Sequence, residues 1–324
     1  MKRGTPGFST PERAETEEKG RVLIRNRALC GERRPIMTYA FFPGCSMEGT
    51  ARDYQKSSLA VGQALGLALP EIPGWTCCGS TSAHQTDHLL SIALPAKNLA
   101  VAAGQTVVVG CAACYSRLKI ANHEIAADPD TRKAVATVLG KDYDGKTQVL
   151  HLLEIMARDV GMRKIAQAVK HPLKDLKVVT YYGCLLARPP EATKFDDPEN
   201  PTLMDKVMEA AGATVLDWPH KTECCGASYS ITDVDIVKRL TREILAMAKA
   251  AGADCIVTAC GMCQMNLDLR QRDTEKAAGE SFNLPVFYFT QLLGLAFGIS
   301  RKDLGLRSLV TSPRKLLAER GIGA

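Results

Sequence analysis

Cysteines occur along this chain in one order that is repeated. Each copy has an isolated cysteine, an adjacent pair followed by glycine, and a Cys-x-x-Cys sequence. The segments between these groups are 31 and 32 residues long in the first copy, and 39 and 34 in the second. The first copy consists of Cys45, Cys77, Cys78, Cys111 and Cys114, and the second of Cys184, Cys224, Cys225, Cys260 and Cys263. Such an internal repeat predicts a fold built from two similar halves.

Apolar segments repeat in step with the cysteines. Each half begins with a short apolar strand ending in Gly-Cys, TYAFFPGC or KVVTYYGC, and an amphipathic helix then leads to Cys-Cys-Gly. A second helix ends in Ala-Ala-Gly, and a β-branched strand, TVVVG or CIVTA, precedes Cys-x-x-Cys. Short strands alternating with helices predict an α/β fold with mainly parallel pairing. We therefore expect two pseudo-symmetric cysteine-rich repeats, each a small mainly parallel sheet with flanking helices.

The repeat also suggests how the chain is divided. We expect a first repeat, a linker, a second repeat and a basic tail, at residues 37–161, 162–176, 177–300 and 301–324. Residues 1–36 are rich in Arg, Glu, Gly and Pro and have no apolar period, which is typical of disorder. Because Met37 directly precedes the first strand, this extension is either disordered or the product of a wrongly assigned start codon. Cys30 lies in it and receives no role.

Composition and charge exclude several classes of protein. Apolar residues make up 46% of the chain, yet no apolar run approaches the roughly 20 residues that cross a bilayer. The first 20 residues lack the apolar core of a secretory signal, so we expect a cytoplasmic protein without a membrane span. The net charge of +6 comes from residues 1–36 and 301–324, since the rest has 26 basic and 28 acidic side chains. We therefore expect no nucleic-acid binding.

The first and third cysteine groups of each half follow strands. In parallel sheets, the carboxyl ends of the strands lie at one edge, where ligands usually bind. Cys45 and Cys111 stand just after two strands of the first half, as Cys184 and Cys260 do in the second. We expect the loops after these strands to converge and to bring the cysteines of each half together.

Several chemistries use cysteines in such numbers. Disulfides pair thiols in twos, which leaves one over in each set of five, and they are rare in a reducing compartment. Zinc takes four ligands, so that a fifth thiolate would be surplus, although zinc in one half stays an alternative. A redox-active Cys-x-x-Cys needs only two cysteines. Thiolates suit iron–sulfur clusters, which ordinarily use four cysteines. Five with an adjacent pair favour a larger or more open cluster, in which one thiolate bridges two irons.

The pattern resembles a known family. Both sets of five cysteines, together with YAFFPGCSMEGTARDY, YYGCLLARP, FDDPENP, CCGAS and CGMCQMNLD, resemble the CCG domains of the heterodisulfide reductase B subunit over about residues 37–300. Ala112 and Gly261 stand inside the Cys-x-x-Cys turns, where that family often has proline. The resemblance implies two noncubane 4Fe-4S clusters, each held by all five cysteines of one half. It also implies that a disulfide substrate is bound between them.

The same resemblance implies partners. The sequence has no ferredoxin-type run of four cysteines, no Gly-x-Gly-x-x-Gly fingerprint and no Walker loop, so electrons must come from elsewhere. The family implies two further subunits, one small and ferredoxin-like and the other flavin-containing. Two alternatives remain: an electron-transfer subunit for lactate, glycolate, glycerol-3-phosphate or succinate oxidation, and a zinc-stabilised scaffold. The sequence does not identify the thiol or disulfide substrate.

Other polar and thiol side chains receive weaker assignments. Cys255 begins a strand and fits neither cysteine set, so we expect a small core residue. His84 and His88 are spaced for one face of a surface helix. Lys221 and Arg188 lie near cysteine-bearing loops, where each is either a solvated charge or a contact for an acidic substrate.

Overall fold

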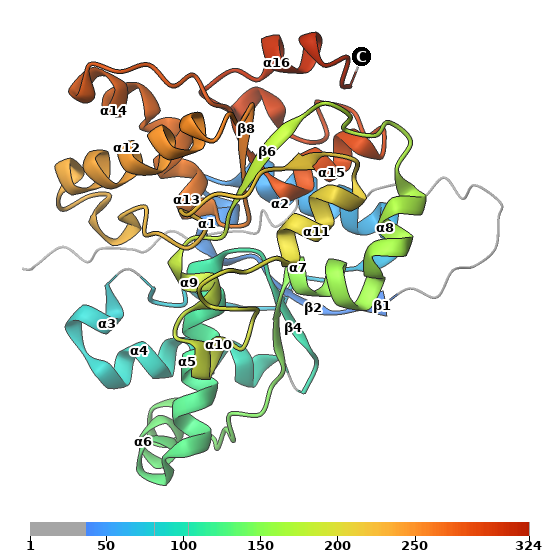
Figure 1. Ribbon diagram of the computed structural model, residues 1–324. Helices are drawn as coiled ribbons and strands as arrows, with labels where there is room; N and C mark the ends of the chain where they lie inside the picture. Colours follow the sequence, from blue (N-terminus) through green and yellow to red (C-terminus); the bar gives the residue numbers. More distant parts are fainter. Residues whose placement is uncertain (1–36, 81, 103, 324) are drawn as a thin grey trace, which may run out of the picture. The chain divides into compact units, whose positions relative to one another are not determined.

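The computed structural model describes residues 37–80, 82–102 and 104–323 (Figure 1). The expected extension of residues 1–36, with Cys30, lies outside the described residues.

The first half contains five short strands, all paired in parallel. One pair is β1 (Met37–Thr38) with β3 (Leu67–Ala68), and a second sheet has the order β2-β4-β5. Its strands are β2 (Ala40–Phe42), β4 (Val107–Val109) and β5 (Val149–His151). Phe42 lies opposite Val109, and Val109 lies opposite His151. Apart from His151, the residues of the three strands are apolar, and almost all are buried, as expected for a parallel sheet covered on both faces.

The second half repeats this order in one four-stranded parallel sheet. Its order is β7-β6-β8-β9, with β6 at Lys177–Tyr181, β7 at Thr214–Val215, β8 at Cys255–Thr258 and β9 at Val286–Tyr288. The strand that leads to the first cysteine therefore lies next to the strand that leads to Cys-x-x-Cys in both halves. The predicted α/β architecture of two similar repeats is confirmed.

Helices connect and cover the strands. Those of the first half are α1 (Gly44–Glu48), α2 (Arg52–Leu65), α3 (Ala83–Thr86), α4 (His88–Val101), α5 (Ala112–Ala127), α6 (Pro129–Leu139), α7 (Leu152–Glu154), the π-helix η1 (Ile155–Gly161) and α8 (Met162–Ala168). Those that follow are α9 (Cys184–Ala187), α10 (Pro190–Thr193), α11 (Leu203–Ala210), η2 (Ala227–Tyr229), α12 (Val234–Ala250), α13 (Gly261–Gln264), η3 (Met265–Leu269), α14 (Gln271–Ala278), α15 (Phe289–Ala296), η4 (Leu306–Ser308) and α16 (Arg314–Glu319). None of the described helices is long and apolar enough to cross a membrane.

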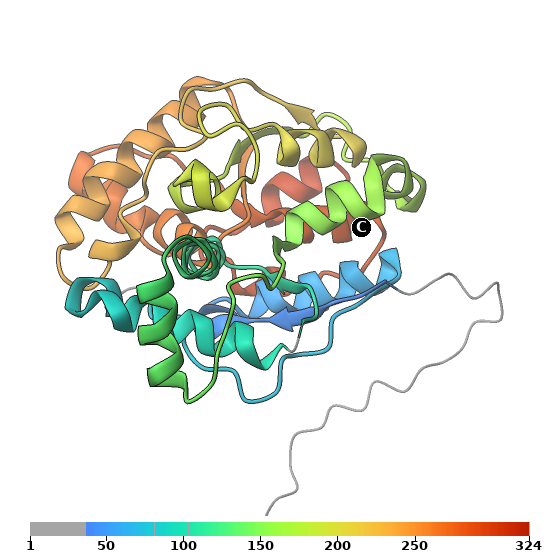
Figure 2. The same cartoon turned by 90° about the horizontal axis from the view of Figure 1, so that it is seen from below.

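Helices of each half pack against helices of the other half. Helix α2 of the first half lies beside α15 of the second, and both Figure 1 and Figure 2 show the blue helix next to the red one. Tyr54 stacks on Tyr288 with ring centroids 4.1 Å apart, and the Ser57 and Thr290 hydroxyls are 2.7 Å apart. In return, α9 and α10 of the second half pack on α5 of the first, where the Tyr115 hydroxyl donates to a backbone carbonyl of α10 at 3.0 Å. Residues 37–323 thus share one hydrophobic core.

The segment expected to be a basic tail, residues 301–324, continues through η4 and α16. It buries Leu304, Leu317 and Ile322 in the common core. This segment therefore adds apolar side chains to the second half as well as positive charge.

Candidate metal centre

The five cysteines of the first half lie on three segments that meet at the sheet edge. Cys45 is in α1 directly after β2, Cys77 and Cys78 are in the loop before α3, and Cys111 and Cys114 begin α5 after β4. The Cys78 and Cys114 sulfurs are 3.3 Å apart. Cys77 lies within hydrogen-bonding reach of Cys45. The expected convergence of this set is therefore present.

The second set repeats this arrangement. Cys184 begins α9 after β6, Cys224 and Cys225 lie in the loop before η2, and Cys260 and Cys263 flank the start of α13 after β8. The Cys225 and Cys263 sulfurs are 3.7 Å apart. The backbone N–H of the glycine that follows each adjacent pair donates to the first thiol of that pair, at 3.4 Å in the first half and 3.3 Å in the second. This shared contact gives the repeated glycine a role in orienting the loop.

The two sets meet each other. Cys111 precedes the first residue of α5, Cys260 precedes that of α13, and each thiol lies within hydrogen-bonding reach of the other. Cys114 and Cys260 hold the pKa of Cys111 well below its usual range, whereas Cys111 raises the pKa of Cys260. Elements α1, α9 and α13 lie close together near the centre of Figure 1. The contact joins the two halves at their cysteines.

Each set extends from the core to the surface. Cys45, Cys77 and Cys224 are exposed and Cys184 is half-buried. The other six are buried, namely Cys78, Cys111, Cys114, Cys225, Cys260 and Cys263. Hydrogen bonds with neighbouring thiols, together with burial, raise the pKa of Cys114 and Cys263 well above the usual value. A bound cation favours the thiolate form and would reverse this effect.

The donor set fits an iron–sulfur cluster better than a single metal ion. Thiols make up each group, and soft sulfur ligands suit iron–sulfur clusters. Among the described residues, no three His, Cys, Asp or Glu side chains surround one metal-ion position. A cluster of several irons can bridge thiols that lie farther apart than the ligands of one ion.

Two glycines keep space beside the Cys-x-x-Cys sulfurs. Gly44 and Gly183 precede the first cysteine of each set and have φ values of +68°. A Cβ on Gly44 would lie 2.8 Å from the Cys114 sulfur, and one on Gly183 would lie 2.9 Å from the Cys263 sulfur. The strand ends can approach the sulfurs this closely because glycine has no side chain.

We expect Gly183→Ala to displace the Cys263 sulfur and to weaken metal loading of the second half. The backbone strain at Gly183 costs about 1–3 kcal/mol, and the clash with sulfur adds to it. Iron content and thermal midpoint measure the two effects. Gly252→Ala is the matched control, because its φ of +78° imposes strain while nothing lies within 4 Å of its Cβ. Equal losses of iron in the two variants would contradict a specific effect on Cys263.

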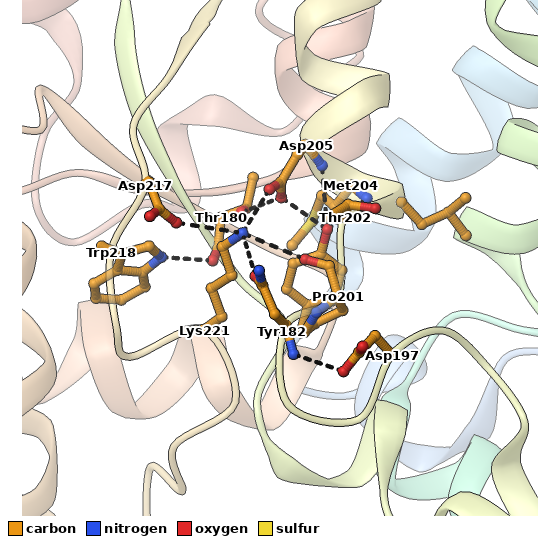
Figure 3. Close-up of polar contacts among 12 residues, drawn as sticks. Thr180, Tyr182, Asp197, Pro201, Thr202, Met204, Asp205, Asp217, Trp218 and Lys221 are labelled. Atoms are coloured by element: carbon orange, nitrogen blue, oxygen red, sulfur yellow. Dashed lines mark hydrogen bonds and ion pairs between the residues drawn. The ribbon is translucent and has the colours of Figure 1, made fainter.

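Lys221 connects the backbone before Cys184 with the loop that carries Cys224 (Figure 3). Its backbone carbonyl accepts from the N–H groups of Tyr182 and Gly183, at 2.9 and 3.1 Å, just before Cys184. Its ammonium group contacts Asp205 at 2.8 Å and the Asn200 side chain at 2.9 Å. Only 5% of Lys221 is exposed, so it is neither a solvated charge nor free for a substrate.

The hydroxyl groups around Asp205 complete this network. Tyr182 donates to the Asp205 carboxylate at 2.8 Å, and Thr180 donates to the same oxygen. The preceding residue of β6, Tyr181, donates its hydroxyl proton to the carbonyl of Glu223 at 2.6 Å. Glu223 directly precedes Cys224. The end of β6 therefore holds the loop with Cys224 through side chains as well as backbone.

The remaining polar and thiol residues named from the sequence belong to neither cysteine set. Arg188 pairs with the exposed Glu199 at 2.9 Å. His84 and His88 are both exposed, as expected, but they do not share one helix face. The extended Asp87 separates α3, which holds His84, from α4, which begins at His88. His88 contacts Glu124. Cys255 is fully buried in β8, which confirms its assignment to the core.

His151 was not found by sequence reasoning, although it lies beside the first set. It is fully buried at the end of β5. Its Nδ1 accepts from the N–H of Leu153 at 3.1 Å, so that Nε2 carries the proton and donates to the carbonyl of Gly110 at 2.8 Å. Gly110 directly precedes Cys111, and burial lowers the pKa of His151 to about 4. The imidazole therefore positions the start of α5 in its neutral form.

We expect His151 to make folding stability depend on pH. Unfolded histidine has a pKa of about 6.5. As pH falls from about 6.5 toward 4, the unfolded chain therefore binds a proton at this side chain, whereas the folded protein does not. Stability is thus fully present above this window, and about 1–1.5 kcal/mol is lost between pH 7.5 and 5.5. His151→Gln should make the thermal midpoint less dependent on pH over that interval. The exposed His123→Gln is the control, and an unchanged pH dependence in His151→Gln would refute the assignment.

Comparison with known proteins identifies the same two repeats. Residues 39–119 and 178–268 match the CCG family, described as a cysteine-rich domain. The 8-methylmenaquinol:fumarate reductase membrane anchor subunit of Wolinella succinogenes is 35% identical over 86% of this chain and 98% of its own. The B subunit of the Ferredoxin/F(420)H(2)-dependent CoB-CoM heterodisulfide reductase of Methanosarcina acetivorans is 30% identical over 86% and 96%.

More distant relatives extend the comparison. The Probable glycolate oxidase iron-sulfur subunit of Bacillus subtilis is 24% identical over 71% of this chain and 49% of its own. A hypothetical protein from Helicobacter pylori shares the fold with a TM-score of 0.68 and 13% identity, over 86% of this chain and 53% of that structure. The chain thus spans about half the length of that structure.

These matches establish the family. The chain belongs to the proteins with two CCG cysteine-rich domains and is similar along its repeats to the heterodisulfide reductase B subunit. Its cysteine-rich domains and its relatives indicate an iron–sulfur subunit of an oxidoreductase.

Proposed function

We propose that this chain is the catalytic subunit of a heterodisulfide reductase-like complex, which reduces a disulfide or, in reverse, oxidises two thiols. The observation that carries the proposal is the meeting of two matched cysteine sets at Cys111 and Cys260. A bond between two sulfur atoms is itself symmetric, so that two equivalent sites facing one position suit its two ends. Cys45, Cys77 and Cys224 bring both sets to the surface, whereas Cys111 and Cys260 meet in the interior.

Each set would hold one noncubane 4Fe-4S cluster. The ligands would be Cys45, Cys77, Cys78, Cys111 and Cys114 for one cluster, and Cys184, Cys224, Cys225, Cys260 and Cys263 for the other. When bound, each cluster would supply one of the two electrons that a disulfide requires. With two protons, R–S–S–R′ then yields RSH and R′SH. The chain itself would contribute buried thiols in the core and exposed thiols at the surface to both centres.

Electrons would reach this protein from partner proteins. Several relatives are subunits by name, among them the B subunits of two heterodisulfide reductases. We propose that a ferredoxin-like subunit is the direct donor and that a flavin-containing subunit reduces this donor in turn. The cytoplasm suits such an assembly, because exposed thiols persist there in reduced form.

A second function has a specific observation in its favour. The Wolinella relative named as a fumarate reductase subunit is 35% identical, and a glycolate oxidase subunit matches too. In this function the clusters would pass electrons between a flavoprotein dehydrogenase and another carrier. No disulfide would then bind at the contact between Cys111 and Cys260.

The two functions can be separated with protein purified without oxygen. We expect iron and acid-labile sulfide, with little zinc, and a new electron paramagnetic resonance signal when a thiol is added to the oxidised protein. Dithiothreitol, dihydrolipoamide, glutathione and coenzyme M with coenzyme B are suitable probes. Oxidation and reduction by a flavoprotein without any thiol-dependent signal would favour the electron-transfer function. Zinc without iron would refute both.

A further inference from the structure

The C-terminal segment surrounds a cavity that the cysteine sites do not use. Residues between 301 and 317 line a volume of about 400 Å³. Its cationic lining consists of Arg301, Lys302, Arg307 and Arg314. Leu306, Leu309 and Leu317 provide an apolar part of the wall, and all three are buried. The wall of the cavity therefore combines four positively charged side chains with an apolar part.

The positive charge at this cavity is not neutralised by the described part of the chain. Residues 301–324 carry six basic side chains, and two of them form ion pairs elsewhere: Lys315 with Glu319 at 3.9 Å and Arg320 with Asp254 at 2.9 Å. The other four are those that line the cavity, and none of them forms an ion pair with a described residue. The Arg301 Nε is also buried without a hydrogen-bond partner there. Four cations held together in this way repel one another unless an anion binds.

The cavity wall is fixed to the core. The buried Asp268 carboxylate accepts from the backbone N–H groups of Val310 and Thr311, both at 2.8 Å. The Gln291 side chain donates to the carbonyl of Leu304 at 3.2 Å. Asp268 lies in η3, which continues the helix that begins beside Cys263. Because both ends of the wall are tied to buried groups, the site is formed before a ligand arrives, which limits the entropy lost on binding.

We propose that this cavity binds a small organic anion that carries adjacent phosphate groups on a moiety with an apolar face, such as the base of a nucleoside diphosphate. Guanidinium groups bind phosphate oxygens in pairs of parallel hydrogen bonds, and three arginines are present. The leucines fit the apolar part of such a ligand. The volume falls in the range of about 300–1,000 Å³ typical of small-molecule sites, whereas protein interfaces are broad. Binding here is independent of the function proposed for the cysteines.

Isothermal titration of the full chain, purified without oxygen, tests the proposal with ADP, inorganic pyrophosphate and adenosine as probes. We expect ADP to bind one site saturably, pyrophosphate to bind more weakly, and adenosine not to bind. Arg307→Gln combined with Arg314→Gln should weaken ADP binding about tenfold or more, because each guanidinium makes charge-assisted bonds. Both side chains are exposed, so the variant should fold.

The matched control removes two exposed positive charges from α2 and α6, in Lys56→Gln combined with Lys133→Gln. ADP affinity should change less than twofold in this variant. Equal weakening in both double variants would show a general charge effect and overturn the proposal. Failure of ADP and pyrophosphate to bind would overturn it as well. If only a glutamate-rich decapeptide bound, and binding were lost in the arginine variant, the site would instead take an acidic protein segment.

Discussion

Replacing Cys225 by serine is expected to remove one of two iron–sulfur clusters and to abolish disulfide reduction. The iron content should fall from about eight to about four per chain, since each of the two proposed clusters has four irons. The Cys225 sulfur lies 3.7 Å from the Cys263 sulfur, and Cys225 is buried. Water could therefore replace this ligand only if the core opened. Cys78→Ser should have the same effect on the first set, where the Cys114 sulfur is 3.3 Å away. Iron, sulfide and electron paramagnetic resonance measurements report each loss.

The matched control for these variants is Cys255→Ala. Cys255 is as buried as Cys225 but lies within β8, and burial raises the pKa of its thiol. We expect this variant to lose some stability through the small cavity it leaves, while its iron content stays unchanged. Retention of all iron and activity in both Cys78→Ser and Cys225→Ser would rule out the ligand assignment.

The second large effect concerns stability rather than chemistry. Lys221→Met is expected to lower the free energy of unfolding by about 3–5 kcal/mol, because it leaves the buried Asp205 carboxylate without its cation. The side chain of Lys221 is 6% exposed and that of Asp205 is 12% exposed, so water cannot compensate either charge fully. The thermal midpoint should fall by about 10 °C. Iron in the second set should also decrease, since the carbonyl of Lys221 holds the backbone before Cys184.

An exposed ion pair from the same region provides the comparison. Arg188→Gln breaks the contact with Glu199, whose side chain is 78% exposed, and should cost no more than about 1 kcal/mol. Adding Asp205→Leu to Lys221→Met should restore part of the lost stability, because the uncompensated charge is then gone. A decrease in Lys221→Met no larger than in Arg188→Gln would contradict the role given to this pair.

Local sequence patterns were sufficient to predict the strands that precede the cysteines and the convergence of the cysteines, but not β3 and β7, which have two residues each. Strand ends carry Cys45 and Cys184, and parallel pairing brings such ends to one edge without further information. The position of each helix beside its own cysteine also followed from the repeat. These features depend on short segments and on one topological rule.

Contacts between distant segments could not be predicted in the same way. The stacking of Tyr54 on Tyr288 and the bond between Lys221 and Asp205 depend on how helices pack, which no short pattern encodes. His151 gave no motif, because its partners are backbone groups. The apolar side chains of residues 304–317 were a usable signal, but the positive charge of the segment led us to expect a tail.

The packing of helices across the two halves has a consequence for synthesis of the chain. The hydroxyls of Ser57 and Thr290 are in contact but stand 233 positions apart. While the ribosome is still translating the second repeat, α2 therefore lacks the surface against which it packs. A first repeat expressed on its own would leave this face of α2 uncovered, since α15 packs on it in the whole chain.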